Sequence, residues 1–266
     1  MQNLNDYRIA ITGASEGLGL AMAKAFLACG AQVIAIARSA ERLEAVRQLG
    51  ATTIAGDATD AQVMNNIVAD EQPDVLVLNA GARLTAKTID NQSWDEFSAV
   101  WNTDVKASLV GIQAALHTPM KRGSRVMTMS SGAAMVMSSP FIEPESLYLS
   151  GGYIGAKRMI WYMAYQANVV SKKRELGIHF QVLAPGQLMP GTALGQAVAS
   201  AYGNVEGVSA EQHVLQRYGS ILEPDRFGEM VSDLIGDPNY SQGVAYGFRV
   251  DAGIIRLDLA ETGKRA

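Results

Sequence analysis

The stretch Thr12-Gly13-Ala14-Ser15-Glu16-Gly17-Leu18-Gly19 lies between an apolar run at residues 7–12 and a segment of helical periodicity at residues 18–29. The run is typical of a buried strand, so the glycines mark a strand-to-helix turn. We expect Gly13 to make the tight turn, Gly17 to let the backbone approach a pyrophosphate, and Gly19 to let the helix pack close to the strand. A helix that begins at such a turn offers free backbone N–H groups to phosphates. The alternative is a plain turn that uses glycine for its geometry alone.

The rest of the chain alternates short apolar runs with longer segments of helical spacing. We predict further strands at residues 32–37, 52–55, 74–78, 125–130, 178–184 and 244–250, and further helices at residues 40–49, 60–70, 93–117, 153–173 and 225–235. This alternation predicts an α/β fold with a doubly wound, Rossmann-like parallel sheet of about seven strands and helices on both faces. No linker interrupts residues 1–266, which indicates a single domain. Residues 1–130 would mainly bind a cofactor, and residues 131–266 would supply the catalytic and substrate half.

Composition narrows the class of protein. Hydrophobic residues make up 48% and charged residues 18% of the chain, as in ordinary globular proteins. A net charge of −4 argues against a nucleic-acid partner. The sequence shows neither a signal peptide nor a long apolar span, so we expect a cytoplasmic protein without a membrane partner. The three histidines are scattered and Cys29 is the single cysteine, so no metal site and no internal disulfide are expected.

Further motifs follow the predicted strands. In chain order they are Asn79-Ala80-Gly81 after residues 74–78, Ser131 after residues 125–130, Tyr153 and Lys157 in a YxxxK pattern, Pro185-Gly186 after residues 178–184, and VDAG at residues 250–253. Together with the TGxxxGxG turn, these motifs resemble those of the short-chain dehydrogenase/reductase family over nearly the whole chain. The resemblance implies an NAD(P)(H)-dependent oxidoreductase that moves a hydride between its cofactor and a carbonyl or secondary alcohol, most simply in ketone reduction.

Tyr153 and Lys157 form the expected acid/base pair. They are four residues apart on a predicted helix and therefore share a face. An ammonium close to a phenol favours the phenolate, so Tyr153 can exchange a proton with the substrate oxygen. By the resemblance, Ser131 hydrogen-bonds the substrate oxygen, Lys157 also binds the nicotinamide ribose, and Asn102 supports a water-linked proton relay. Ser130 is the alternative to Ser131.

The end of the second predicted strand should select the cofactor. Ala37 stands where NAD-preferring relatives carry Asp, and the next residue, Arg38, can bind a 2′-phosphate. NADP(H) is therefore favoured, with NAD(H) as the alternative, because Glu16 stands where NADP-preferring relatives are often basic. Arg38 could also begin a solvated helix with Glu41 and Arg42. The cofactor-binding residues that the resemblance implies are Thr12, Gly13, Ser15, Glu16, Gly17, Leu18, Gly19, Arg38, Asp57, Ala58, Asn79, Ala80, Gly81, Tyr153, Lys157, Pro185, Gly186 and Thr192.

Two segments depart from the family pattern. The stretch between Ser131 and Tyr153 is longer than usual, and residues 135–152 predict a loop beside the active site. Met135 and Tyr148 in this loop, together with Ser131 and Met189, are the candidate substrate contacts. Residues 192–219, which are rich in Ala, Gly and Gln, predict a mobile substrate lid.

Other functions compatible with the fold are a non-catalytic dinucleotide-binding sensor and an epimerase or dehydratase of the same family. The presence of both Tyr153 and Lys157 disfavours the sensor, and 266 residues leave little room for the added substrate domain of an epimerase. The resemblance also implies a homodimer or homotetramer, assembled through the helices at residues 93–117 and 153–173.

Overall fold

One mostly parallel sheet organises the chain. The computed structural model describes residues 2–138 and 148–258, and within these ranges eight strands lie in the order β3-β2-β1-β4-β5-β6-β7-β8. Their bounds are β1 Arg8–Thr12, β2 Gln32–Ala37, β3 Thr52–Ala55, β4 Val75–Leu78, β5 Arg125–Met129, β6 His179–Pro185, β7 Ala245–Arg249 and β8 Gly253–Arg256. The strands β1 to β7 pair in parallel, and β8 pairs antiparallel with β7. The strand order reverses between β1 and β4, which is where such sheets bind ligands.

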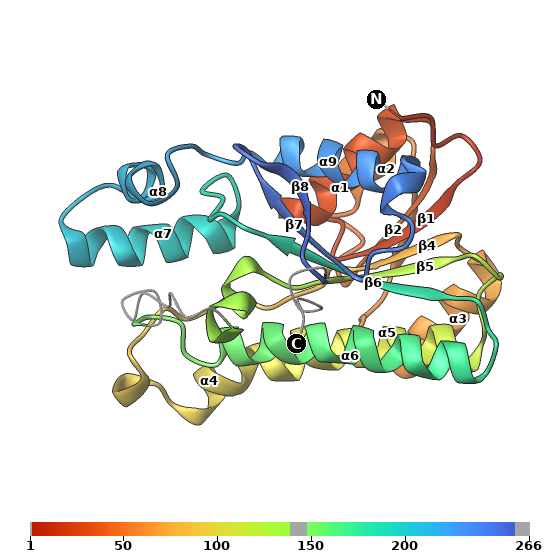
Figure 1. The fold of residues 1–266 in the computed structure, drawn as a ribbon, viewed down its shortest axis with the longest axis horizontal. Helices are drawn as coiled ribbons and strands as arrows, with labels where there is room; N and C mark the ends of the chain where they lie inside the picture. The colour runs from red at the N-terminus through yellow and green to blue at the C-terminus, as the bar shows by residue number, and fades with distance from the viewer. Residues whose placement is uncertain (1, 139–147, 259–266) are drawn as a thin grey trace, which may run out of the picture.

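Helices cover both faces of the sheet (Figure 1). One face carries α1 Gly17–Ala28, α2 Glu44–Gln48 and α9 Pro224–Gly236, and the other carries α3 Ala61–Glu71, α5 Lys106–His117 and α6 Tyr153–Lys173. Two further helices, α7 Ala193–Glu206 and α8 Ala210–Tyr218, project beyond the carboxyl ends of the strands. The expected α/β fold with helices on both faces is confirmed.

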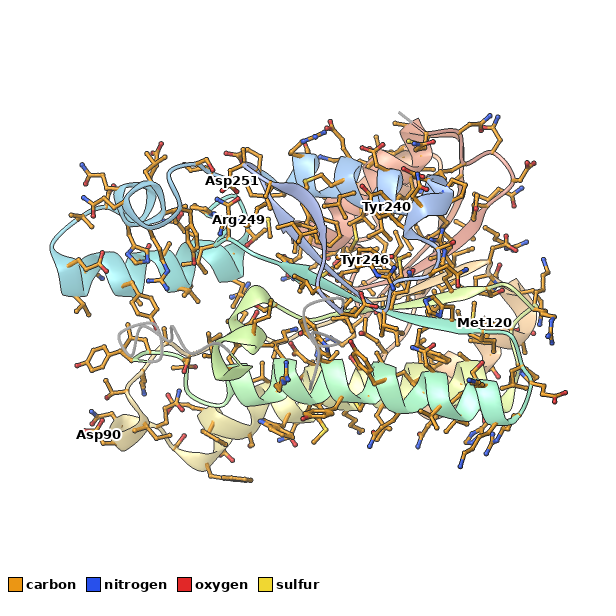
Figure 2. The ribbon with its side chains drawn as sticks, in the orientation of Figure 1. Asp90, Met120, Tyr240, Tyr246, Arg249 and Asp251 are labelled. Carbon is orange, nitrogen blue, oxygen red and sulfur yellow. The ribbon has the colours of Figure 1, made fainter. Side chains whose placement is uncertain are left out.

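The core consists of two layers separated by the sheet, and side chains fill both (Figure 2). Ile9 and Ile11 of β1 pack on the α1 and α9 side, whereas Ala10 between them faces α5 and α6. Phe227 of α9 meets Phe248 of β7 edge to face, with ring centroids 5.0 Å apart. Burial on both faces explains why the central strands read as continuous apolar runs.

The long helix predicted at residues 93–117 is not continuous. It consists of α4 Trp94–Val100, a π-helical turn Trp101–Val105 (η2) and α5. In the wide turn the Lys106 N–H donates to the Trp101 carbonyl, five residues back. Such insertions rotate the side chains that follow them and occur frequently at functional sites.

Three other segments also refine the sequence prediction. Residues 192–219 contain α7 and α8, and the sheet is extended by the antiparallel strand β8. In the predicted loop at 135–152, residues 132–138 form a 3-10 turn (η3, Gly132–Ser138), whereas residues 139–147 lie outside the described residues. Among the helices that the structure describes, none has the length and apolar character to cross a membrane.

Candidate active site

A cavity of about 1050 Å³ opens at the carboxyl ends of the strands. Its wall includes Arg38 after β2, the glycine turn after β1, Ser131 after β5 and Tyr153 of α6. Residues of α7 and α8, the helices that project beyond the strand ends in Figure 1, also line it. The structure therefore brings the glycine motif and the predicted acid/base pair to one site.

The glycine turn has the shape of a phosphate cradle. Gly13 and Gly17 have φ of +68° and +56°. A Cβ on Gly19 would lie 2.1 Å from the Gly13 carbonyl oxygen, whereas a Cβ on Gly17 would meet no atom within 4 Å. The side chain of Glu16, which precedes α1, makes no capping hydrogen bond to the helix. The N-terminus of α1 thus keeps both space and donors for the phosphates of a dinucleotide.

Thr12 and Asn79 hold this cradle together from behind. The Thr12 hydroxyl accepts hydrogen bonds from the Asn79 N–H at 3.0 Å and the Ala80 N–H at 3.1 Å. The Asn79 amide donates to the carbonyls of Thr12 and Gly13 at 3.1 and 3.2 Å. Thr12 is buried, and neither it nor Gly19 lines the cavity. Both residues shape the turn from outside the cavity, and their contact with a cofactor stays a prediction.

Exposed charges line the end of the cavity next to β2 and β3. Arg38 and Arg42 both lie on its wall, and Arg42 is 3.6 Å from the Glu16 carboxylate. Asp57 accepts hydrogen bonds from the Thr59 N–H and hydroxyl at 2.8 and 2.9 Å. These hydrogen bonds, with the charge of Arg38, hold the pKa of Asp57 below its usual value. The sequence analysis named Arg42 only in the alternative in which Arg38 begins a solvated helix, although its spacing of four residues from Arg38 was the available signal for a second guanidinium here.

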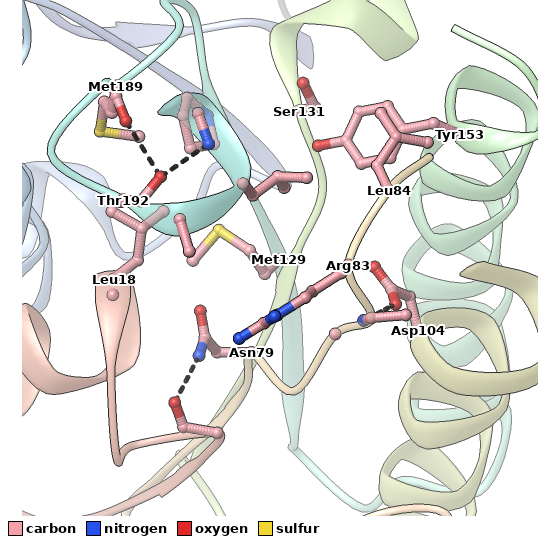
Figure 3. A pocket seen from close by; sticks show the side chains of 18 of the residues that line it. Leu18, Asn79, Arg83, Leu84, Asp104, Met129, Ser131, Tyr153, Met189 and Thr192 are labelled. Atoms are coloured by element: carbon pink, nitrogen blue, oxygen red, sulfur yellow. Dashed lines mark hydrogen bonds between the residues drawn. The ribbon is translucent and has the colours of Figure 1, made fainter. Parts of the chain in front are cut away.

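Two serines follow β5, and the structure separates their roles. Ser130 is buried and its hydroxyl donates to the Lys157 carbonyl oxygen at 2.8 Å. Both serines line the cavity, but it is the Ser131 hydroxyl that is directed to the same region as that of Tyr153 (Figure 3). The geometry supports the choice of Ser131 over Ser130 as the substrate-contacting residue.

Lys157 is buried beneath Tyr153. Its ammonium lies 5.6 Å from the centroid of the Tyr153 ring and donates to the Met129 carbonyl at 3.1 Å. It also pairs with the Asp104 carboxylate at 2.8 Å, and the two side chains are only 7% and 4% exposed. Although burial by itself lowers the pKa of Lys157, the charges of Asp104 and Tyr153 raise it above its ordinary value. Lys157 is therefore a charged group throughout the neutral range.

Asp104, rather than Asn102, is the residue of the interrupted helix that reaches Lys157. Both residues line the cavity, but the Asn102 amide donates to the Ser98 hydroxyl one turn back. Asp104 contacts Lys157 and also accepts a hydrogen bond from the Ala82 N–H at 2.7 Å. Sequence reasoning missed Asp104 because it assumed a regular helix, whereas the π-turn changes the direction of the side chains. The sequence offered little signal, because Asn102, Thr103 and Lys106 next to Asp104 are also polar.

The other predicted site residues either line the cavity or lie outside it. Pro185, Gly186, Met189 and Thr192 line the cavity. Thr192 caps α7, accepting from the Gly195 N–H and donating to the Met189 carbonyl, both at 3.0 Å (Figure 3). The cavity-lining candidates from the predicted cofactor set are Gly13, Ser15, Glu16, Gly17, Leu18, Arg38, Asp57, Ala58, Asn79, Ala80 and Gly81.

Met135 and Tyr148 are not among the residues that line the cavity, so their contact with a substrate stays a prediction. Met135 packs against the core on the α6 side of the sheet, and Tyr148 is 55% exposed. The wall next to α7 is formed instead by Leu149, Leu194, Val198 and Tyr202. Within the described ranges, no group of three or more His, Cys, Asp or Glu side chains is arranged to hold a metal ion.

Several known proteins are similar to this chain in sequence or in fold. A family model described as short chain dehydrogenase matches residues 8–144. L-fucose dehydrogenase of Rattus norvegicus is 23% identical over 250 residues, which cover 89% of this chain and 85% of the relative. The ketoacyl reductase HetN of Nostoc sp. is 27% identical over 200 residues, covering 70% of this chain and 65% of that protein. A short chain dehydrogenase from Burkholderia cenocepacia, solved in complex with NADP, has a TM-score of 0.70 at 24% identity and covers 92% of this chain and 96% of its own.

Proposed function

This chain belongs to the short chain dehydrogenase family, and we propose that, within the oxidoreductase chemistry of that family, it reduces a carbonyl compound to a secondary alcohol with NADPH. The observation that carries the proposal is the shared cavity, in which the phosphate cradle after β1 and the Ser131–Tyr153–Lys157 group face the same space. A cavity of this kind can hold a dinucleotide and a small substrate together.

Tyr153, Ser131 and Lys157 each have a separate part in the proposed reduction. The dinucleotide, when bound, supplies the hydride that adds to the carbonyl carbon. The Tyr153 hydroxyl gives its proton to the carbonyl oxygen, so that the C=O bond becomes a CH–OH group. Ser131 donates a hydrogen bond to the same oxygen and stabilises the negative charge that develops there. Lys157 places its ammonium 5.6 Å from the centroid of the phenol ring, next to the group that gives up the proton.

Two features support NADP(H) over NAD(H). Ala37 at the end of β2 lacks the carboxylate that would accept a hydrogen bond from a ribose hydroxyl and repel a phosphate. Arg38 and Arg42 stand at the same edge of the cavity, where a guanidinium can bind a 2′-phosphate in a bidentate manner. The related Burkholderia protein is described in complex with NADP.

The substrate end favours a carbonyl compound with an apolar part. Leu149, Met189 and Leu194 give this wall an apolar surface, with Tyr202 and Arg217 as polar neighbours. Apolar walls with a few polar groups are typical of small-molecule sites.

Self-association through α5 and α6 is part of the same proposal. Leu109, Met159, Tyr162 and Val169 lie on these two helices and are between 38% and 56% exposed. Apolar groups of this kind gathered on neighbouring helices are typical of protein interfaces. Sedimentation of the wild type and of Tyr162→Glu tests this, with a dimer or tetramer expected only for the wild type.

The test of the catalytic proposal is oxidation of NADPH over a panel of ketones and aldehydes, with NADH in parallel. Wild type should consume NADPH with at least one carbonyl and prefer it to NADH, whereas Tyr153→Phe should bind NADPH and turn over none. Binding without any turnover in the wild type would contradict the proposal and support a non-catalytic dinucleotide sensor. A preference for NADH would contradict the role of the two arginines.

A further inference from the structure

A buried ion pair joins Asp104 to Lys157, the lysine that lies next to Tyr153. The carboxylate is 2.8 Å from the ammonium, and both side chains are almost fully buried. The remaining Asp104 oxygen accepts from the Ala82 N–H, and Lys157 also donates to the Met129 carbonyl. The pair therefore joins the loop after β4, the end of β5, the π-turn and α6 at one point.

This arrangement changes what Tyr153 experiences. A lone ammonium 5.6 Å from the ring would strongly favour the phenolate, because a charge acts over a longer distance than a dipole. With a carboxylate in contact with it, the ammonium acts on its surroundings as one half of a dipole. The positive potential at Tyr153 is thereby reduced, while the position of Lys157 is fixed.

We propose that Asp104 is a positioning residue that anchors the Lys157 ammonium and offsets its charge, so that Tyr153 stays protonated and the site is set to donate a proton to a carbonyl oxygen. This inference rests on the proposed function, because it assigns the preferred direction of that reaction. It predicts that removal of the Asp104 charge makes Tyr153 easier to ionise and favours alcohol oxidation at lower pH.

Among the carboxylates that line the cavity, Asp104 is the one closest to Tyr153 and Lys157. Asp104 and Tyr153 are the charged or titratable neighbours that act on Lys157. Arg83, from the loop after β4, lines the same cavity, as do His213 and Arg217 from α8 (Figure 3). Glu16 and Asp57 lie at the opposite end, next to Arg42 and Thr59.

A spectroscopic titration tests the proposal without cofactor or substrate. The absorbance of tyrosinate is followed against pH in the wild type and in Asp104→Asn. Each titration is repeated in a Tyr153→Phe background, and the difference gives the transition of Tyr153 alone. We expect the Tyr153 transition of Asp104→Asn to lie lower by about one pH unit or more. Asp90→Asn, which removes the charge of an exposed acid at Ile89–Asn91, is the matched control and should leave the transition in place.

The outcomes separate the proposal from a purely structural role. An unchanged transition in Asp104→Asn, or a shift equal to that of Asp90→Asn, would overturn it.

If Asp104→Asn does not fold, Asp104→Asn/Lys157→Met removes both charges and leaves no unpaired ion. The transition of this double variant should lie close to that of the wild type, because the pair is nearly neutral at Tyr153. A rise of about one pH unit or more in the double variant would show that Lys157 acts uncompensated, and the proposal would fail. Because the titration needs no turnover, its failure is distinct from a failure to find a substrate.

Discussion

The charged side chains at the two ends of the cavity differ in how far they are exposed to water. At the end next to β2, the Arg42 and Glu16 side chains are 60% and 61% exposed. At the catalytic end, the Lys157 and Asp104 side chains are 7% and 4% exposed and in direct contact. Exposed charges are screened by water and contribute little to folding, so they are free to select a ligand. A buried charge must be compensated by the fold itself, so its loss affects stability as well as chemistry.

Tyr153→Phe should give the largest effect and tests the catalytic end without altering its charge. Loss of the proton donor is expected to lower kcat for carbonyl reduction by about 10²-fold to 10⁴-fold. NADPH affinity and the unfolding transition should stay close to wild type, because the ring and its packing are kept. Rapid-mix kinetics and fluorescence binding measure the two quantities, and equal turnover in both proteins would exclude Tyr153 as the proton donor.

Lys157→Met should show that the buried pair is part of the fold. The Asp104 carboxylate would be left buried without its partner, at a cost of about 3–5 kcal/mol in the free energy of unfolding. Urea denaturation measures the change, and Asp104→Asn/Lys157→Met should recover most of it. Because the pKa of Lys157 is raised in the folded protein, its contribution to stability should be fully present below the ordinary pKa of lysine. The contribution should be lost as the pH rises through the raised pKa. A double variant as unstable as Lys157→Met would contradict the pairing.

Gly19→Ala tests the turn that lies between the two ends. A Cβ there would lie 2.1 Å from the Gly13 carbonyl oxygen, so we expect a loss of about 1–3 kcal/mol in unfolding free energy. Gly50→Ala is a useful comparison, since Gly50 has a positive φ, which Gly19 does not, and a Cβ there would meet no atom within 4 Å. Thermal and urea unfolding of the two variants should separate the cost of the clash from the cost of the backbone conformation.

Arg38→Ala should affect the ligand and leave the fold intact. We expect the affinity for NADPH to fall about tenfold, which corresponds to about 1.4 kcal/mol, with little change for NADH. The difference should shrink as salt is added, because the site is exposed. Calorimetric binding at two salt concentrations checks both statements. Equal losses for NADPH and NADH would argue against a 2′-phosphate contact.

Asp57→Asn should give the smallest effect. Because the pKa of Asp57 is lowered in the folded protein, its contribution to stability is present above the ordinary pKa of Asp. The contribution is lost as the pH falls through the lowered pKa. Because the residue is exposed, we expect the variant to lose less than about 0.5 kcal/mol at neutral pH. Urea unfolding at neutral and acid pH measures this, and a large loss would mean that the exposed end is also structural.

Local sequence patterns were enough to predict the fold class and several residues that meet at the cavity. Buried parallel strands must be apolar on both faces, so the run at residues 32–37 predicted β2 with its observed bounds. The bounds of the edge strand β3 were also predicted, although this strand is partly exposed. The bounds of α6 were likewise predicted, because its apolar periodicity is regular from Tyr153 to Lys173. Parallel strands end at one edge of a sheet, so the residues that follow them were expected to meet, and the cavity includes Gly17, Ser131 and Tyr153.

Only the tertiary structure decided which polar groups touch inside the site. Asp104 lies in a π-turn that helical periodicity does not reveal, and there it contacts Lys157 of α6 and the Ala82 N–H in the loop after β4. In the same way, Thr12 was placed behind the cradle by its hydrogen bonds to Asn79 and Ala80, contacts between strands far apart in sequence. Spacing along the chain fixes which residues leave the same strand or helix face. Which of them are buried together, and with what charge, depends on contacts between elements that no local pattern encodes.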